Sequence, residues 1–480
     1  MEKPETIREY LDVVQEQIRW KRARPVVARE LEQHLADQRD AFQAEGHDPE
    51  TAERLAVEEM GDPVSIGTEL DRVHRPKPQW GLLVATTTLA LLGGFLRVCL
   101  TASGADTYEN ISLFRTAVAL ALGTACLLGA YFLDYTWLTR HAAGVYIGAL
   151  TLGALSLWLS LGINHASYYT RYVVLLYPTV YAVWLYHCRG KRWKGFLLAI
   201  LGGVPLAIIG CLAPYILGIL LLMVTSFALL LAAAGTDWFG VGRGKTAAVV
   251  LGIAAAMAGS VVWQAWKNGW YQNRLLRFLH PELDPLGHGY QAITVRKVLF
   301  VSQWLGTGDW SETGSAFSFE RSVPDWTLDF LPATVIYKLG WLPFLLLVLS
   351  VAGLLLWLLW KCLRQRNQAG RLVALSVILP LGLQMLFSVM QNLGYILFSA
   401  SMPLVTGNLP TVITMGLIGL ALSVFREEPI AREDSTERGS VSHIRLSLRN
   451  EKDVQNGARV LGVSLIISQD GTKAAEGSSL

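Results

Sequence analysis

Hydrophobic residues dominate the chain from Trp80 to Phe425, where they form about ten runs that each approach the length of a membrane-spanning helix. A helix needs about 20 apolar residues to cross the hydrocarbon core of a bilayer. The predicted spans are residues 81–101, 112–133, 142–162, 169–187, 195–213, 215–234, 246–266, 332–360, 372–397 and 408–425. This pattern predicts an all-α fold, polytopic in the membrane, with a long eighth span that tilts or begins outside the bilayer.

Residues 1–77, before the first span, have the polar and apolar alternation of soluble helices. Apolar residues recur at helical spacing between Ile7 and Ile18, which is typical of a helix with one buried face. Two further helices are expected to begin at the Asp-Pro pairs that start at Asp48 and Asp62, because aspartate caps a helix and proline fits its first position. The sequence therefore predicts a small soluble helical domain over residues 1–77.

Composition supports a membrane protein and excludes several other classes. Hydrophobic residues make up 52% of the chain, charged residues only 16%, and the mean hydropathy is +0.37. More than a third of the charged residues lie before Pro78. The rest of the chain therefore has too few charged residues for the surface of soluble domains. The five cysteines form no CxxC pair, which argues against a disulfide scaffold. The sequence also lacks a concentrated basic face, so a nucleic-acid partner is not expected.

The basic loops set the expected orientation. Lys and Arg cluster after the fourth, sixth and eighth spans, and such loops stay in the cytoplasm. Both termini are therefore expected to be cytoplasmic. Residues 267–331 are expected to form one large outer loop in which function is concentrated. The polar tail, residues 426–480, is predicted to be disordered, although residues 443–448 alternate like a strand.

Two motifs stand out in the large outer loop, whereas P-loop, HExxH and GxSxG motifs are absent from the chain. Residues 278–291 read FLxPExDPxGxGYQ, and residues 324–340 read PDxxxDFxxAxxxxxLG. Shorter strings accompany them, namely Thr101-Ala102-Ser103 with Phe114-Arg115 after the first span, and Asn392-Leu393-Gly394 with Thr406-Gly407 before the last. Over residues 80–425 these strings resemble the SEDS family, the RodA, FtsW and SpoVE group of bacterial proteins.

The resemblance implies a function as well as a fold. Members of this family are multi-pass proteins of the bacterial cytoplasmic membrane that act in cell shape, division or sporulation. They are peptidoglycan glycosyltransferases that polymerise lipid II at the outer face of that membrane, usually beside a class B penicillin-binding transpeptidase. Membrane lipid, lipid II and such a transpeptidase are therefore the expected partners. Residues 1–77 separately resemble the helical prefix domain of some bacterial permeases, which implies a regulatory or docking module.

The chemistry that the resemblance implies needs a base and a set of cations. An inverting glycosyltransferase with a lipid pyrophosphate-linked donor needs one carboxylate to take the proton of the attacking sugar hydroxyl. The family's essential aspartate falls on Asp329. Donors near the pyrophosphate stabilise its growing negative charge, and arginine suits phosphate because its planar fork donates in pairs. The expected substrate-binding residues are Arg115, Arg274, Gln291, Arg321, Asn392 and Thr406.

Two further points concern charge and metal. Arg97 lies within the first predicted span, and an intramembrane charge is costly enough to make it a functional candidate. No ligand spacing links the histidines or cysteines, so no metal site is expected from protein ligands alone. The cofactor requirement stays open, with a divalent cation as one possibility.

Other interpretations remain open at this point. Asp329 is also placed to cap the eighth span, since an acid before a helix stabilises its positive end. The family usually has two glutamates where this chain has Tyr337 and Lys338, and a lysine there would be able to pair with Asp329 and lower its basicity. These departures favour a non-catalytic scaffold or lipid II sensor that binds a transpeptidase. A transporter of lipid-linked substrates on the same helices is a third interpretation.

Overall fold

The computed structural model describes residues 6–21, 23–75, 78–102, 113–133, 135–160, 169–213, 215–287, 289–309, 329–365, 367–426, 445–448 and 463–466. The chain divides into two compact units. The first comprises Met1–His74 together with Pro429–Leu480, and the second comprises Arg75–Glu428.

The first unit contains four helices that surround a small apolar core. They are α1 (Ile7–Gln17), α2 (Arg24–Ala44), α3 (Pro49–Met60) and α4 (Pro63–His74). Tyr10, Val14 and Leu35 are fully buried between them, so the expected apolar face is the packed face. Both expected Asp-Pro starts are present: Asp48 accepts a hydrogen bond from the backbone N–H of Thr51 at 3.1 Å, and Asp62 accepts one from Ser65 at 2.9 Å.

Two short strands belong to the C-terminal part of the first unit. The strands β1 (Arg445–Leu448) and β2 (Val463–Ile466) pair antiparallel, with Arg445 opposite Ile466. The strand β1 lies within the alternation seen at 443–448. The rest of the tail, for which we predicted disorder, lies outside the described residues.

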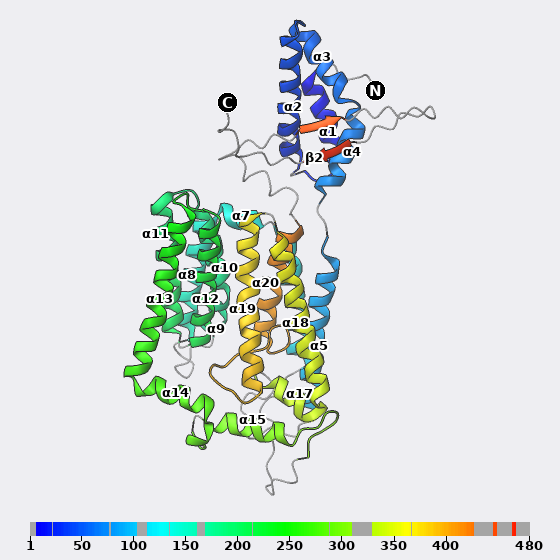
Figure 1. The fold of residues 1–480 in the computed structure, drawn as a ribbon. Coiled ribbons are helices and arrows are strands. Elements are labelled where there is room, and N and C mark those ends of the chain that lie inside the picture. Colours follow the sequence, from blue (N-terminus) through cyan, green and yellow to red (C-terminus); the bar gives the residue numbers. More distant parts are fainter. Residues whose placement is uncertain are drawn as a thin grey trace, which may run out of the picture. The chain divides into compact units, whose positions relative to one another are not determined.

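The second unit is a bundle of long apolar helices (Figure 1). Its elements are α5 (Trp80–Ala102), α6 (Leu113–Phe132), α7 (Tyr135–Arg140), α8 (Ala142–Ser160), α9 (Thr170–Val173), the 3₁₀ helix η1 (Val174–Leu176), α10 (Tyr177–His187), α11 (Arg192–Leu212), α12 (Ile216–Gly235), α13 (Arg243–Lys267), α14 (Gly269–Leu279), η2 (Pro281–Leu283), α15 (Tyr290–Phe300), α17 (Leu331–Leu339), α18 (Trp341–Arg364), α19 (Gln368–Asn392) and α20 (Leu409–Arg426). Nine helices among the described residues are long and apolar enough to cross a membrane.

The difference between about ten expected spans and nine such helices lies in residues 169–187. This stretch is helical throughout but consists of α9, η1 and α10 in succession, each too short to span alone. Pro178 explains the interruption, because proline has no N–H and its ring clashes with the carbonyl group four residues earlier, at Val174. The 3₁₀ turn lies at Val174–Leu176, directly before the proline, as expected for a locally disrupted helix.

The long eighth span of the prediction is two helices rather than one. Gly340 separates α17 from α18 with a φ of 107°, a conformation that favours glycine. A Cβ atom at Gly340 would lie 2.6 Å from the carbonyl oxygen of Trp304. Residues 303–308 run beside this junction and bond to both helices: Gly306 and Gly308 donate to carbonyl groups of α17, while carbonyl groups of Gln303 and Trp304 accept from the first residues of α18.

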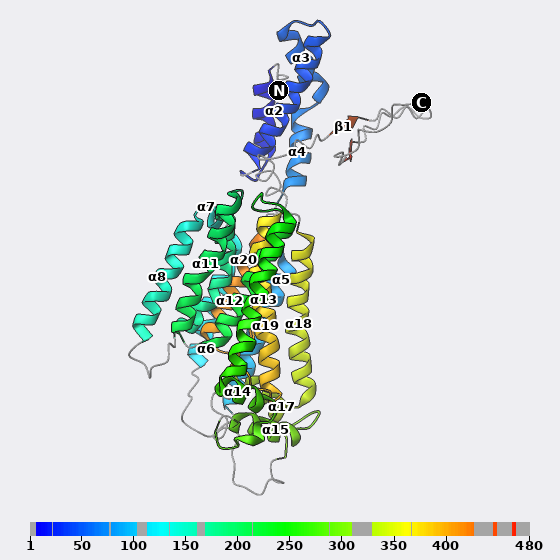
Figure 2. The same ribbon diagram turned by 60° about the vertical axis from the view of Figure 1, so that its left-hand side comes forward.

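The helices α19 and α20 lie near the centre of the bundle (Figure 2). The helix α6 packs along α20. Buried residues make up 67% of the apolar window of α19 and 72% of that of α20. Small residues allow the contact between α6 and α20, because a Cβ at Gly419 would lie 2.3 Å from the carbonyl oxygen of Leu127. Close backbone approach through small residues is the usual way in which membrane helices associate.

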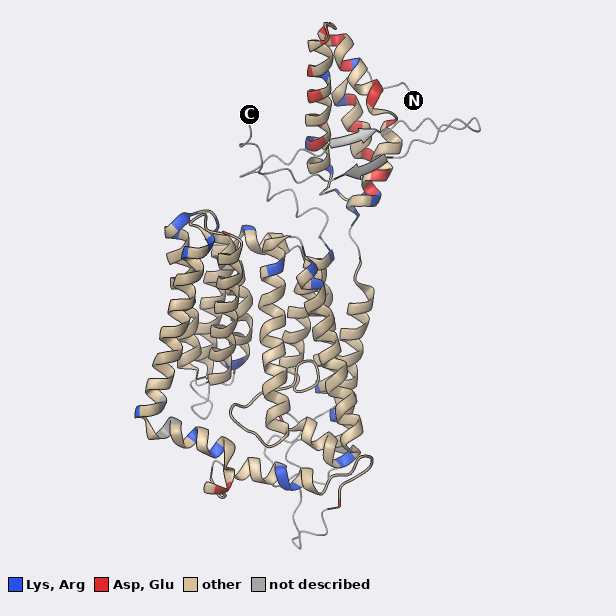
Figure 3. Ribbon diagram, in the orientation of Figure 1, with Lys and Arg blue, Asp and Glu red and all other residues tan. Residues whose placement is uncertain are grey.

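The helices α14, α15 and α17 lie together at one end of the bundle, called here the α14–α15 end (Figure 1). There α14 and α15 run across the long helices rather than along them. Figure 3 shows that Lys and Arg gather toward the ends of the bundle, while most Asp and Glu lie on the first unit. A charge-poor middle with charged ends is the distribution expected of membrane-spanning helices.

The first unit gives a testable prediction about stability. A fragment of residues 1–77 should unfold cooperatively, and Asp62→Ala should lower its free energy of unfolding by about 1 kcal/mol, because the cap to Ser65 is lost. Urea unfolding followed by circular dichroism measures this. Asp37→Ala, an exposed position inside α2, is the control and should change the free energy by less than about 0.5 kcal/mol. A fragment that shows no cooperative transition would contradict the prediction.

Candidate active site

Asp329 lies two residues before α17, at the α14–α15 end, and it is partly exposed. Its Oδ2 atom accepts a hydrogen bond from the hydroxyl group of Ser399 at 2.6 Å. The N-cap position of α17 belongs to Phe330, which follows it. The carboxylate is therefore partly accessible from outside the protein and has a hydroxyl donor beside it.

Asn392, the last residue of α19, holds the start of α17 through its side-chain amide. The Oδ1 atom accepts from the backbone N–H of Ala333 at 2.9 Å, so Asn392 caps α17 from another helix. The Nδ2 atom donates to the backbone oxygen of Asp329 at 3.0 Å and to that of Ser388 at 2.8 Å. Asn392 is fully buried. We expected it to bind substrate, whereas its amide bonds the backbone at Asp329 and Ala333 and that of its own helix.

Residues 393–408, the 393–408 loop, connect α19 to α20 without regular structure. Two arginines of the α14–α15 end form hydrogen bonds with the backbone of its first half. Arg274 of α14 donates to the carbonyl oxygen of Leu397 at 2.8 Å, and Arg296 of α15 donates to that of Gly394 at 3.2 Å. We expected Arg274 to bind substrate, and one of its guanidinium nitrogens instead donates to the backbone of the loop.

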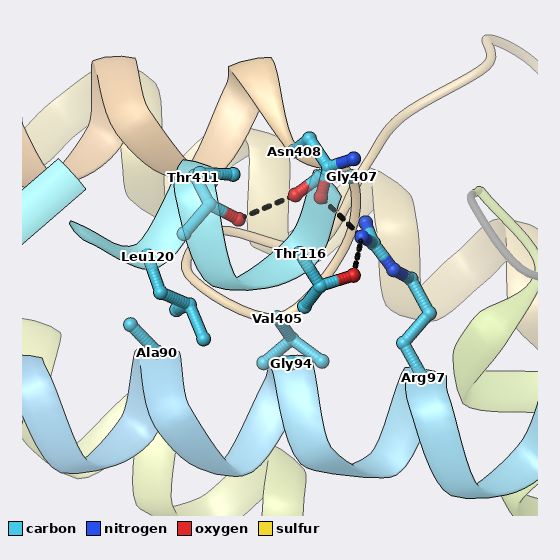
Figure 4. A pocket seen from close by; sticks show the side chains of 10 residues that line it. Ala90, Gly94, Arg97, Thr116, Leu120, Val405, Gly407, Asn408 and Thr411 are labelled. Carbon is cyan, nitrogen blue, oxygen red and sulfur yellow. Dashed lines mark hydrogen bonds between the residues drawn. The ribbon is translucent and has the colours of Figure 1, made fainter. Parts of the chain in front are cut away.

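Arg97 holds the other end of the 393–408 loop, although it lies in the apolar helix α5 and is only 2% exposed. Its guanidinium group donates to the hydroxyl group of Thr116 at 2.7 Å and to the side-chain oxygen of Asn408 (Figure 4). A small cavity lies beside this contact, lined by α5, α6, the loop and α20. A buried cation that bonds polar groups on separate elements fits the rule that intramembrane charges face the bundle interior.

The other expected site residues lie at various places around this end. Arg115 is exposed near the start of α6, and Gln291 is partly exposed in α15. Thr406 is buried, and its hydroxyl group donates to the carbonyl oxygen of Met402 at 3.1 Å. Arg321 lies outside the described residues. Lys338 stands at the far end of α17 from Asp329, and its ammonium group donates to the carbonyl oxygen of Leu100 at 3.1 Å.

Three side chains near Asp329 were not found from the sequence. Ser399 bonds the carboxylate directly. The side chain of Tyr215, at the start of α12, packs in one apolar cluster with Phe398 and Ala400, which flank Ser399. Burial and then the negative charge of Asp329 raise the pKa of the Tyr215 hydroxyl group, whereas the positive charge of Arg171 lowers it. Arg171 of α9 also donates to the hydroxyl group of Tyr172 at 2.6 Å. No motif includes these residues, because they come from three segments that only the fold brings together.

The described part of the chain contains no group of three His, Cys, Asp or Glu side chains that could hold a metal ion. The described residues around Asp329 offer its carboxylate, hydroxyl groups and arginines for chemistry. A carboxylate can accept a proton, and arginine is suited to phosphate groups.

Comparison with known proteins supports the resemblance noted in the motifs. A probable peptidoglycan glycosyltransferase FtsW of Halorhodospira halophila is 27% identical over 352 residues, which cover 68% of this chain and 83% of that protein. The peptidoglycan glycosyltransferase MrdB of Escherichia coli K12 is 27% identical over 210 residues, 43% of this chain and 54% of that protein.

Solved structures show the same architecture. A chain from a peptidoglycan synthase complex that coordinates polymerization and crosslinking superposes with a TM-score of 0.57 at 22% identity, covering 73% of this chain and 98% of that one. At this identity the likeness concerns the fold alone. The FtsW/RodA/SpoVE family model, described as "Cell cycle protein", matches residues 80–429. With most of the sequence inside that match, this chain belongs to the FtsW/RodA/SpoVE family, a family of multi-pass membrane proteins.

Proposed function

We propose that the protein is a peptidoglycan glycosyltransferase that polymerises lipid II at the outer face of the bacterial cytoplasmic membrane, in cell shape, division or sporulation. The observation that carries this proposal is the partly exposed carboxylate of Asp329, positioned by Ser399 and Asn392 at the end of a membrane-spanning bundle. The relatives named as peptidoglycan glycosyltransferases support it.

The proposed reaction is a single displacement. A sugar hydroxyl group of one lipid-linked substrate attacks the anomeric carbon of the other, and its proton passes to the carboxylate of Asp329. The bond from that carbon to the lipid pyrophosphate breaks as the new bond forms, so the configuration at the carbon inverts. Asp329 suits the role of base because it lies where sugar groups at the membrane surface are within reach, while the lipid tails remain beside the apolar helices.

The leaving pyrophosphate requires positive charge. Arg274 and Arg296 support the 393–408 loop through part of their guanidinium groups. The positive charge of Arg171 lowers the pKa of Tyr215, which the charge of Asp329 raises, and its guanidinium group donates to the hydroxyl group of Tyr172 at 2.6 Å. Arg115 is exposed near the start of α6. We assign the binding of the pyrophosphate to Arg171 and Arg115. Arg321 and Gln291 are proposed as further substrate contacts. Asn392 and Thr406 are proposed to support the backbone of the site.

The proposed placement in the membrane follows from the charge rule. Basic loops at the end opposite α14 and α15 are expected in the cytoplasm, which places Asp329 outside and both termini inside. A class B penicillin-binding transpeptidase is the proposed protein partner. The structurally similar complex that couples polymerization to crosslinking supports this partner.

Replacement of the proposed base tests the function directly. Asp329→Asn keeps the size of the side chain and an acceptor for Ser399, but it cannot take a proton. Polymerisation of lipid II by the purified protein with a transpeptidase partner should fall about 10²–10⁴-fold. Product chains are measured by gel electrophoresis at equal folded amounts.

Asp284→Asn is the matched control, because Asp284 is an acid at the same end whose carboxylate lies 3.6 Å from Arg277. It should retain most of the activity. Equal rates for wild type and Asp329→Asn would refute the base assignment. A wild type that makes no glycan with any partner would instead favour a scaffold.

Cysteine labelling tests the orientation. In a cysteine-free background, Leu286→Cys places a thiol at a residue that is 92% exposed at the α14–α15 end, and Lys194→Cys places one at the exposed opposite end, at the start of α11. A membrane-impermeant thiol reagent should label the first in intact cells and the second only after lysis. The opposite result would place Asp329 in the cytoplasm and overturn the proposed function.

A further inference from the structure

We propose that Ser399 is the residue that positions the carboxylate of Asp329 through the proton transfer, an inference that rests on the proposed function. The hydroxyl group donates to Oδ2 at 2.6 Å, which is a short, charge-assisted bond. The contact that Ser399 makes is with the proposed base, so the role we assign to it is positioning.

A hydroxyl group suits this role because it is both a donor and an acceptor. Before the reaction it donates to the carboxylate. When the carboxylate has taken the proton of the sugar hydroxyl group, the serine hydroxyl can rotate and accept from the new carboxylic acid, so the contact persists on both sides of the transfer. The serine keeps its own proton throughout, and the proton balance involves only the sugar and Asp329.

The backbone on either side of Ser399 is fixed. Before it, Arg274 donates to the carbonyl oxygen of Leu397 at 2.8 Å. After it, the N–H of Ala400 donates to the side chain of Gln391 at 2.7 Å, and Gln384 donates to both oxygens of Ser401 at 3.0 Å. Ser399 itself is exposed, between these anchored positions. The loop therefore presents one hydroxyl group, at a fixed place, to the carboxylate.

The same segment also holds the backbone of the proposed base. Asn392 donates to the carbonyl oxygen of Asp329 at 3.0 Å, seven residues before Ser399 in the chain. One contact fixes the main chain of Asp329 and the other fixes the carboxylate. Two points of attachment from one rigid segment determine the direction in which the carboxylate faces, and a displacement of about 1 Å in a reacting group can cost about 10²-fold in rate.

Substitution of Ser399 tests the inference in the full-length protein. Ser399→Ala removes the hydroxyl group and should lower kcat for lipid II polymerisation about 10- to 100-fold, with KM nearly unchanged because binding is not affected. Ser399→Thr keeps the hydroxyl group and should restore most of kcat. Ser399→Cys, of similar size with a weak donor, should fall between them, and it also serves if the alanine variant folds poorly.

Ser401→Ala is the matched control. Ser401 lies two residues away in the same loop, and Gln384 keeps its bond to the backbone oxygen when the Ser401 hydroxyl group is removed. This variant should have nearly normal kcat. Equal losses in both variants would show that only the loop matters, and would overturn the specific role of Ser399.

A double-mutant cycle distinguishes positioning from general damage. If Ser399 acts through Asp329, then Asp329→Asn with Ser399→Ala should be no slower than Asp329→Asn alone. Additive losses would overturn the inference, as would full activity of Ser399→Ala in an active background. If the wild type itself makes no glycan, the proposed function fails, and the role of Ser399 fails with it.

Discussion

The side-chain amide of Asn392 is the contact on which the candidate site depends. It joins the last residue of α19, a central and mostly buried helix, to the first turn of α17. Both ends of the amide are used, because Oδ1 caps α17 and Nδ2 binds the backbone of Asp329. A buried amide that is fully bonded is stable, whereas one missing partner leaves a polar group without compensation, at a cost of about 1–3 kcal/mol. The position of Asp329 is thereby linked to the centre of the bundle.

The 393–408 loop presents a related problem, since its middle is irregular and buried. Met402, Leu404 and Val405 are at most 2% exposed, so its backbone polar groups need partners other than water. The loop's own backbone supplies part of them, since the N–H groups of Val405 and Thr406 donate to the carbonyl oxygen of Met402. Earlier in the loop, side chains from other elements do so, namely two glutamines of α19 and the arginines of α14 and α15. Irregular backbone at this depth is tolerated where protein surrounds it. These polar side chains stabilise the loop and also shape the site.

The sequence predicted the architecture well and the site only in part. Length and hydropathy located nearly every span. The thickness of the bilayer requires a run of about 20 apolar residues, and such a run can be recognised from the local sequence without knowledge of the fold. The motifs identified the family, which the family match confirmed, and they singled out Asp329, whose role stays a prediction. Ser399, Tyr215 and Arg171 were missed because they lie in three separate segments, and hydropathy and motifs carry no information on which segments meet. The break at Gly340 was missed because apolar residues continue through it, whereas the conformation depends on the close approach of Trp304.

The junction at Gly340 has a mechanical consequence. Residues 303–308 bond to both α17 and α18 across a point where no side chain separates the two backbones. The junction therefore joins three helices. They are α15, whose chain continues into residues 303–308, the short helix α17 after Asp329, and α18, which is long enough to span the bilayer. A displacement of α15 therefore reaches α17 in two ways, through these main-chain hydrogen bonds and through the apolar side chains that pack between the two helices. The position of α17, the helix that follows Asp329, is thus tied to the position of α15 as well as to the centre of the bundle.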